Sequence, residues 1–218
     1  IYWEAINGTI FNCKFENTSA ENGGALLFNC NNCSVINCYF NNLEALNGGS
    51  IYLNGTNLNI INCSFNKTES FALIGGGTGG AIACFGGNNI IKGCDFNNTR
   101  GWDGGAIYLK ASNVIIDNCL FNNCHYSFLN LDQGEGGAIY YIGDYAHIYN
   151  CVFDNCYTGN NGGAIRLNGN KWNIVNCTFN KDKVNWFNGG AFEEYGNDGI
   201  LDNCIFNNCY ADNRGGAV

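Results

Sequence analysis

The aromatic and acidic side chains of a few variable segments are the residues best suited to chemistry. The segments 67–78, 124–135 and 181–188 are the longest of these, and a shorter one contains Trp102 and Asp103. Rings beside carboxylates suit sugar or protein ligands, because a ring packs on apolar surface and a carboxylate accepts hydrogen bonds. The candidate ligand-binding residues are Phe71, Trp102, Asp103, Tyr126, Phe128, Asp132, Glu135, Trp186 and Phe187. Alternatively, these rings do not bind a ligand but fold back and cover the chain as a lid.

Cysteine is the second residue type that could do chemistry, and the chain has 14 of them. Cys124 and Cys156 occupy the same offset in adjacent repeats, so we expect a disulfide between them to be within reach. Cys209 shares this offset, but its neighbour there is Asp182, which leaves it without a cysteine partner.

The Cys30-x-x-Cys33 pair is half of a zinc knuckle. No second pair follows at a useful spacing, so we expect no metal and no other cofactor. Most of the remaining cysteines recur at one repeat position before phenylalanine, where a free thiol acts as a small buried apolar group. Free thiols are therefore the favoured state.

Groups for acid–base catalysis are not clustered along the sequence. The ten basic residues are scattered, and His125 and His147 have no triad partner at matched positions. Glu194 stands where other repeats have an apolar residue, and a register slip that turns it outward is the favoured interpretation. We therefore predict that the chain is not an enzyme. A polysaccharide lyase using Glu193, Glu194 and the segment carboxylates is the minor alternative.

Two phrases recur along the chain and must position these residues. A Gly-Gly pair is followed 15 residues later by Cys-x-Phe, whereas 10 to 17 residues separate that Cys from the next Gly-Gly. The resulting repeats of 25–32 residues are typical of solenoids. The predicted stacked residues are Cys13, Cys38, Cys63, Cys94, Cys119, Cys151, Cys177 and Cys204, and Phe15, Phe40, Phe65, Phe96, Phe121, Phe153, Phe179 and Phe206.

Apolar residues that alternate after each Gly-Gly and before each Cys predict short strands. An Asn directly precedes most of these cysteines, and a left-handed bend at this Asn would bring the flanking apolar residues to one side. Stacking such coils about 4.8 Å apart makes a rod roughly 40 Å long. The predicted fold is all-β, a right-handed parallel β-helix of about eight coils.

Asparagine has two expected roles. The Asn before each Cys is predicted to form an inner stack of hydrogen-bonded amides, so Asn62 and Asn176 should not be modified. Asn54 and Asn66, in predicted turns, are the candidate N-glycosylation sites.

Composition excludes several partners. The net charge of −8 argues against nucleic acid, whose phosphates recruit Lys and Arg. No run of about 18 apolar residues is present, so no membrane span is expected. The chain has no Pro, which suits a stack of strands that needs its backbone donors.

The Gly-Gly-Ala-Ile and Asn-Cys-x-Phe-x-Asn phrases resemble the repeats of archaeal adhesin-like surface proteins and of the polymorphic outer-membrane proteins of intracellular bacteria. The resemblance covers the whole chain and implies an exported, adhesive, right-handed parallel β-helix without catalytic residues. The chain departs from the FxxN phrase of the latter family, since most repeats read Phe-x-Asn. Lys67 and Lys181 replace that Asn in two repeats.

We therefore expect residues 1–218 to be a single solenoid and a fragment of a longer surface protein. The expected function is non-enzymatic attachment at the cell surface, as an adhesin-like or stalk segment. Its variable loops would contact a polysaccharide or protein ligand. The alternative is a structural subunit of an extracellular filament whose open coils stack end to end.

Overall fold

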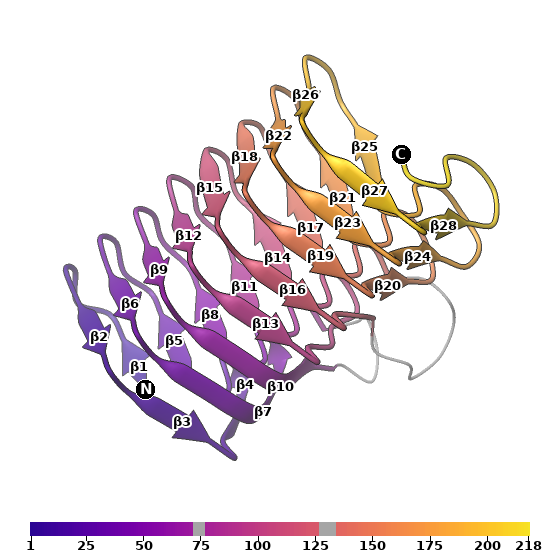
Figure 1. Ribbon diagram of the computed structural model, residues 1–218. Coiled ribbons are helices and arrows are strands. Elements are labelled where there is room, and N and C mark those ends of the chain that lie inside the picture. The colour runs from indigo at the N-terminus through magenta and orange to yellow at the C-terminus, as the bar shows by residue number, and fades with distance from the viewer. Residues whose placement is uncertain (72–76, 127–133) are drawn as a thin grey trace.

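Short parallel strands separated by bends wind around one axis (Figure 1). The structure is a computed structural model that describes residues 1–71, 77–126 and 134–218. These residues contain strands, turns and bends but no helix. The predicted all-β parallel solenoid of about eight coils is confirmed.

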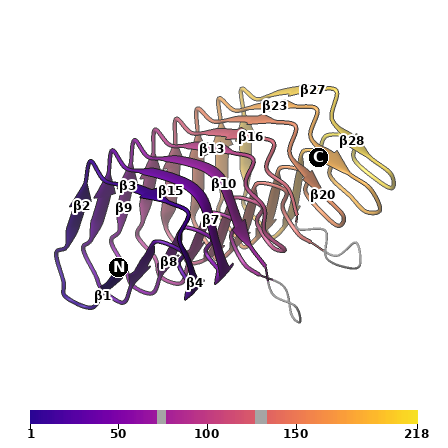
Figure 2. The ribbon, with the colours of Figure 1, turned by 90° about the horizontal axis from the view of Figure 1, so that it is seen from below.

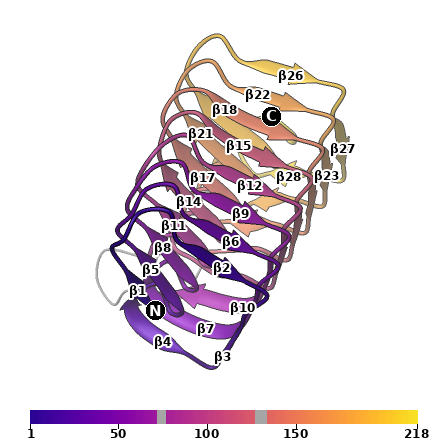
Figure 3. The same ribbon diagram turned by 90° about the vertical axis from the view of Figure 1, so that its left-hand side faces the viewer.

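Each full coil contributes one strand to each of three sheets, all of them parallel. Sheet 1 consists of β1 (Tyr2–Trp3), β5 (Leu26–Phe28), β8 (Ile51–Leu53), β11 (Ile82–Cys84), β14 (Ile107–Lys110), β17 (Ile139–Ile142), β21 (Ile165–Asn168) and β25 (Phe192–Tyr195). Sheet 2 consists of β2 (Thr9–Phe11), β6 (Ser34–Ile36), β9 (Asn59–Ile61), β12 (Ile90–Lys92), β15 (Val114–Asp117), β18 (Ala146–Tyr149), β22 (Asn173–Val175) and β26 (Ile200–Asp202). Figure 3 shows the strands of sheet 2 following one another in a single row.

Sheet 3 carries the phenylalanine of each Cys-x-Phe phrase. It consists of β3 (Lys14–Glu16), β7 (Tyr39–Asn47), β10 (Ser64–Ser70), β13 (Asp95–Asn97), β16 (Leu120–Asn122), β19 (Val152–Asp154), β23 (Thr178–Asn180) and β27 (Ile205–Asn207). A fourth side follows, formed by β4 (Ser19–Asn22), the second halves of β7 and β10, and β20 (Tyr157–Thr158), β24 (Lys183–Val184) and β28 (Tyr210–Ala211). Figure 2 shows β4, β20 and β28 on one side of the rod.

The interior is built from stacked identical side chains. Ile82 pairs in register with Ile51 and Ile107 in the neighbouring coils. The phenylalanine rings of the Cys-x-Phe phrases lie parallel, with centroids 4.8–5.1 Å apart. Burying one such ring contributes about 2–3 kcal/mol. No coil can bury its apolar face alone, so each coil is stabilised by its neighbours.

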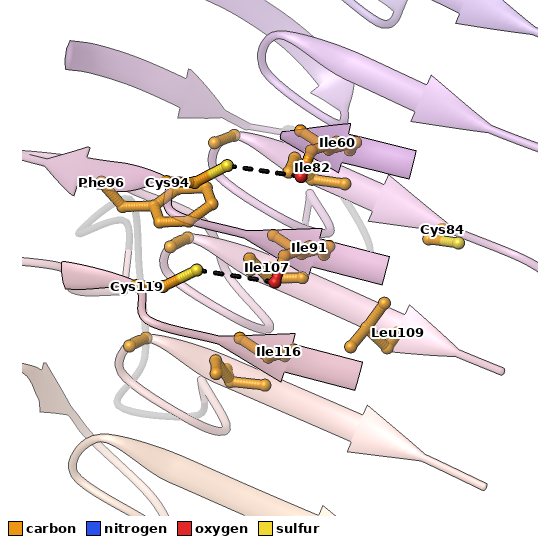
Figure 4. Close-up of a cluster of buried hydrophobic side chains, with 14 of the residues drawn as sticks. Ile60, Ile82, Cys84, Ile91, Cys94, Phe96, Ile107, Leu109, Ile116 and Cys119 are labelled. Atoms are coloured by element: carbon orange, nitrogen blue, oxygen red, sulfur yellow. Dashed lines mark hydrogen bonds between the residues drawn. The ribbon is translucent and has the colours of Figure 1, made fainter. Parts of the chain in front are cut away.

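The cysteines before these phenylalanines form a second stack inside the rod. The Cys94 thiol donates to the Ile60 carbonyl of the preceding coil at 3.6 Å, and the Cys119 thiol donates to that of Ile91 at 3.7 Å (Figure 4). The same contact recurs along the stack. A thiol fits this position because it is small and apolar yet offers a weak donor.

The Gly-Gly pair marks the corner between the fourth side and sheet 1. The first glycine adopts a left-handed conformation, with a φ of 59° at Gly48. The second lies against the next coil, since a Cβ added to Gly49 would lie 2.2 Å from the Gly80 carbonyl oxygen. The first glycine is therefore required for its left-handed conformation, and the second because a side chain would collide with the next coil.

The Asn before each Cys does form the predicted left-handed bend, with φ near 52° at Asn62 and 55° at Asn176. The predicted inner position was wrong, because both side chains are exposed. The left-handed residue interrupts the alternation of side chains, so Ile60 and Cys63 are both buried although they are three residues apart, while Asn62 between them faces solvent. Amide stacking occurs at this outer corner, where Asn176 Nδ2 donates to Asn150 Oδ1 at 3.3 Å.

Two further local expectations were wrong. Asn66 is not in a turn but inside β10, where its amide bonds to Asn41 at 2.7 Å and to Asn97 at 3.3 Å, whereas Asn54 is exposed outside a strand. No register slip occurs at Glu194, which pairs in register with Leu167. The continuous hydrogen bonding of β21 with β25 keeps Glu194 on the face that Leu167 uses.

Candidate ligand-binding face

The residue directly before each Gly-Gly pair belongs to an outer polar row. Glu135 N donates to Asp103 Oδ1 at 3.3 Å, and Asn161 Nδ2 donates to Glu135 Oε1 at 3.3 Å. The structure therefore brings together Asp103 and Glu135, two of the predicted binding residues, in adjacent coils. The corner at Gly104 and Gly136 positions them, because both glycines have left-handed φ values and lock the preceding residue in register.

The outward positions of sheet 1 lie beside this row and carry aromatic rings. We call Tyr52, Phe85, Tyr108 and Tyr140 the aromatic strip. Ring centroids are 5.2 Å apart for Tyr52 and Phe85, 5.7 Å for Phe85 and Tyr108, and 5.7 Å for Tyr108 and Tyr140. The position between Tyr52 and Tyr108 in this row is occupied by Ala83, which has no ring. Phe85, two residues further along the same coil, supplies the ring instead.

The next two outward positions hold Arg166 and Glu193, which pair in register after Tyr140. Arg166 Nε lies 3.5 Å from Glu135 Oε2, and Arg166 Nη1 forms a close ion pair with Glu193 Oε2. We call Asp103, Glu135, Arg166 and Glu193 the carboxylate cluster. The Arg166 side chain is only 14% exposed and those of Glu135 and Glu193 are 21% exposed, so these charges are screened less than surface pairs.

Burial controls the protonation of this face. It raises the pKa of Asp103 to about 6, and the nearby Glu135 charge adds to this rise. Burial also raises the pKa of Glu135, although Arg166 opposes the effect. The pKa values of Tyr108 and Tyr140 are raised by burial and by the Asp103 charge, so both hydroxyls remain donors at neutral pH.

Such an arrangement can accept and donate hydrogen bonds to a polyhydroxylated ligand that lies over the rings. A carboxyl of raised pKa beside a second carboxyl is also used by enzymes for acid–base chemistry. Sequence reasoning indicated no clustered acids and bases, because the basic residues are scattered along the chain and Arg166 was not compared with its counterparts in neighbouring repeats. Two repeat positions carry the signal that could have found the cluster. The residue directly before each Gly-Gly gives Asp103 and Glu135, and the third residue after the second glycine gives Arg166 and Glu193.

The other predicted binding residues differ in exposure. Tyr126 is 5% exposed and packs on Tyr157 with ring centroids 5.2 Å apart. Trp186 and Phe187 are 56% and 45% exposed. Phe71 and Trp102 are half-buried. The predicted residues Phe128 and Asp132 lie outside the described residues.

The cysteine pairing differs from the expectation. Cys124 and Cys156 are free, buried thiols, and each donates to a carbonyl of an earlier coil, Phe96 at 3.7 Å and Phe121 at 3.8 Å. In-register side chains of parallel strands point the same way at about 4.8 Å spacing, which does not suit a disulfide. The disulfide joins Cys30 and Cys33 instead.

The fold and the outward face together define a parallel β-solenoid with one polar and aromatic side. The sequence model described as "Right handed beta helix region" matches residues 1–134, and the chain belongs to this family. The predicted right-handed parallel β-helix is thus confirmed. No curated protein and no solved structure shows significant similarity to the chain. The described residues include no helix with the length and apolar character that crossing a membrane requires.

Proposed function

We propose that this chain is a non-enzymatic β-helix segment that attaches to a cell-surface polysaccharide. The aromatic strip carries the proposal, because it places one ring in each of four successive coils along the rod. Three of these rings, Tyr52, Phe85 and Tyr140, are partly exposed, and Tyr108 is buried. A ligand with a regular repeat, such as an extended polysaccharide, suits a surface that repeats once per coil. Aromatic faces pack on the apolar faces of sugars, and the tyrosine hydroxyls and carboxylates serve the sugar hydroxyls.

The ion pairs of the carboxylate cluster favour attachment over catalysis. Arg166 engages both Glu135 and Glu193, so two of the three carboxylates are held in ion pairs. This leaves Asp103 as the one cluster carboxyl without a cationic partner among the described residues. Acid–base catalysis needs a second, separately placed group, so the arrangement favours binding without bond cleavage.

The exposed rings of Trp186 and Phe187 support an additional contact at the variable loops. They lie just before the Gly189 corner, in the same part of the coil as Asp103 and Glu135. The rigid stack of coils would act as a spacer that presents this face at the cell surface.

Incubation with a panel of cell-wall polysaccharides tests the proposal, with retention and polysaccharide chain length scored together. Wild-type chain should be retained, and Tyr140→Ala should weaken retention about tenfold. Tyr145→Ala is the matched control, because Tyr145 is 43% exposed but lies at the corner between sheets 1 and 2. Equal loss in both variants, or absence of retention by the wild type, would contradict the proposal. Shortening of the polysaccharide would show an enzyme instead.

A further inference from the structure

A polar notch lies on the fourth side of the rod, away from the aromatic strip. Its volume is about 340 Å³, at the lower end of the range for small-ligand pockets. The described residues that line it are all polar or charged. The residues that matter for binding are Asn42, Glu44, Lys67, Glu69, Asn98 and Arg100.

The notch opens where a stack of amides is interrupted. At the corner after sheet 3, Asn42 Nδ2 donates to Asn17 Oδ1 at 2.8 Å, and Asn123 Nδ2 donates to Asn98 Oδ1. Each amide therefore donates to the preceding coil. Lys67 stands between Asn42 and Asn98 in this stack, and its ammonium group can donate to Asn42 Oδ1 but cannot accept from Asn98 Nδ2. Within the described part of the chain, Asn98 Nδ2 therefore lacks the amide acceptor in the preceding coil that its counterparts have.

Lys67 contributes a positively charged side chain at this corner, although its backbone conformation is unfavourable for lysine. Its φ is 51°, in the left-handed region that Asn tolerates better than Lys. Strain of this kind is typical of functional positions but is not sufficient by itself. Lys181 has the same conformation at the same repeat position, with a φ of 56°, and does not line the notch.

Arg100 supplies the second cation and is held in place. Its Nε–H donates to His125 Nε2 at 3.2 Å, while the other ring nitrogen, Nδ1, lies 3.1 Å from the Tyr126 carbonyl oxygen. These contacts fit a neutral imidazole with its proton on Nδ1. Burial, with the Arg100 charge as a smaller cause, lowers the pKa of His125 and favours this neutral form. The planar guanidinium is then oriented for a carboxylate.

We propose that the polar notch binds a carboxylated sugar residue of an acidic polysaccharide. The sugar carboxylate lies between Lys67 and Arg100, and the sugar hydroxyls donate to Glu44 and Glu69. These two glutamates lie side by side in register on neighbouring coils, and Arg100 follows Glu69 in the same row. The two carboxylates offset the two cations, so the notch favours a ligand with a single negative charge and several hydroxyl donors over a phosphate or sulfate of higher charge. The lack of apolar lining disfavours a peptide.

This site stands independently of the aromatic strip. The net charge of −8 disfavours non-specific adsorption of a polyanion. Binding of an acidic sugar therefore reports a specific site. The variant Lys67→Asn completes the amide stack and removes the cation, so it is expected to fold. Lys181→Asn makes the same change in charge and in the stack at a corner outside the notch.

Isothermal titration of the chain with a galacturonic acid trimer, a galactose trimer and an acidic tripeptide tests the proposal. The acidic sugar should bind at least tenfold more tightly than the other two. Lys67→Asn and Arg100→Gln should each weaken it at least tenfold, with Lys181→Asn and Tyr140→Ala unchanged. Failure to bind the acidic sugar, equal binding of the tripeptide, or equal loss in Lys181→Asn would overturn it. Retention of neutral polysaccharide through Tyr140 would remain a separate result.

Discussion

Asp182 Oδ1 accepts the backbone N–H of Cys156 at 2.8 Å, in the interior of the rod. Asp182 is fully buried, and its Oδ2 has no hydrogen-bond partner in the described part of the chain. The in-register positions of the neighbouring coils hold cysteines, so a carboxyl group replaces a thiol in an otherwise apolar stack. Burial in these apolar surroundings disfavours the charged form and raises the pKa of Asp182, so we expect this carboxyl to carry a proton.

This burial predicts an unusual dependence of stability on pH. Burial raises the pKa of Asp182 from 3.8 to about 8, so the folded chain takes up a proton between these values. The contribution of Asp182 to the free energy of unfolding is therefore largest near pH 4 and falls as the pH rises towards 8. The full change is on the order of 6 kcal/mol, because each pKa unit corresponds to about 1.4 kcal/mol.

Urea unfolding between pH 5 and 8.5 measures this slope. Asp182→Asn keeps the acceptor for Cys156 and cannot titrate, so it should be less sensitive to pH than the wild type. Asp202→Asn, at an exposed position, should leave the slope as it is. An unchanged slope in Asp182→Asn would show that Asp182 is ionised in the folded chain.

The second glycine of each pair predicts a sharp difference between two alanine substitutions. An alanine at Gly49 would place its Cβ 2.2 Å from the Gly80 oxygen, whereas one at Gly216 meets only the Cys209 oxygen at 3.8 Å. Gly49→Ala should cost more than about 3 kcal/mol, because backbone must move apart, and Gly216→Ala should be nearly neutral. Thermal unfolding of both variants checks this, and similar melting temperatures would contradict the close approach.

Thiol alkylation should follow burial. Of the twelve free cysteines, Cys13, Cys204 and Cys209 are half-buried and the others are buried. Burial raises the pKa of Cys84 to about 12, which keeps it a poorly reactive thiol. Mass spectrometry after brief alkylation should find modification at these three positions first. All twelve should react after unfolding, and Cys30 and Cys33 only after reduction. Rapid native labelling of Cys94 would argue against the buried stack.

Ligand retention through the aromatic strip should depend on pH. The pKa of Asp103 is raised to about 6, so its carboxylate loses its charge as the pH falls through 6. If it accepts sugar hydroxyls, affinity should drop several-fold between pH 7.5 and pH 5. Asp103→Asn should bind more weakly at pH 7.5 and lose most of this dependence. A wild-type affinity independent of pH would remove Asp103 from the site.

The repeat made the fold predictable from sequence. Parallel, in-register coils place each residue beside its counterpart one repeat away. The regular spacing of Cys63 and Phe65 therefore predicted the stack of thiols and the stack of rings before any contact was known. The same regularity predicted a left-handed bend at Asn62. It did not reveal that this side chain faces solvent, because the bend itself decides which side each neighbour takes.

The sites depended on tertiary structure for a different physical reason. Asp103 and Glu135 directly precede their Gly-Gly pairs, and Arg166 and Glu193 follow theirs at one common offset. The repeat therefore places these residues in neighbouring coils, but only the packing of their side chains decides which of them form hydrogen bonds and ion pairs. Asp103 and Glu135 were singled out by type, yet their contact, and the ion pairs of Arg166 with Glu135 and Glu193, follow from coil stacking. The sequence by itself determined the rod, its corners and its core; stacking decided the carboxylate cluster and the polar notch at Lys67.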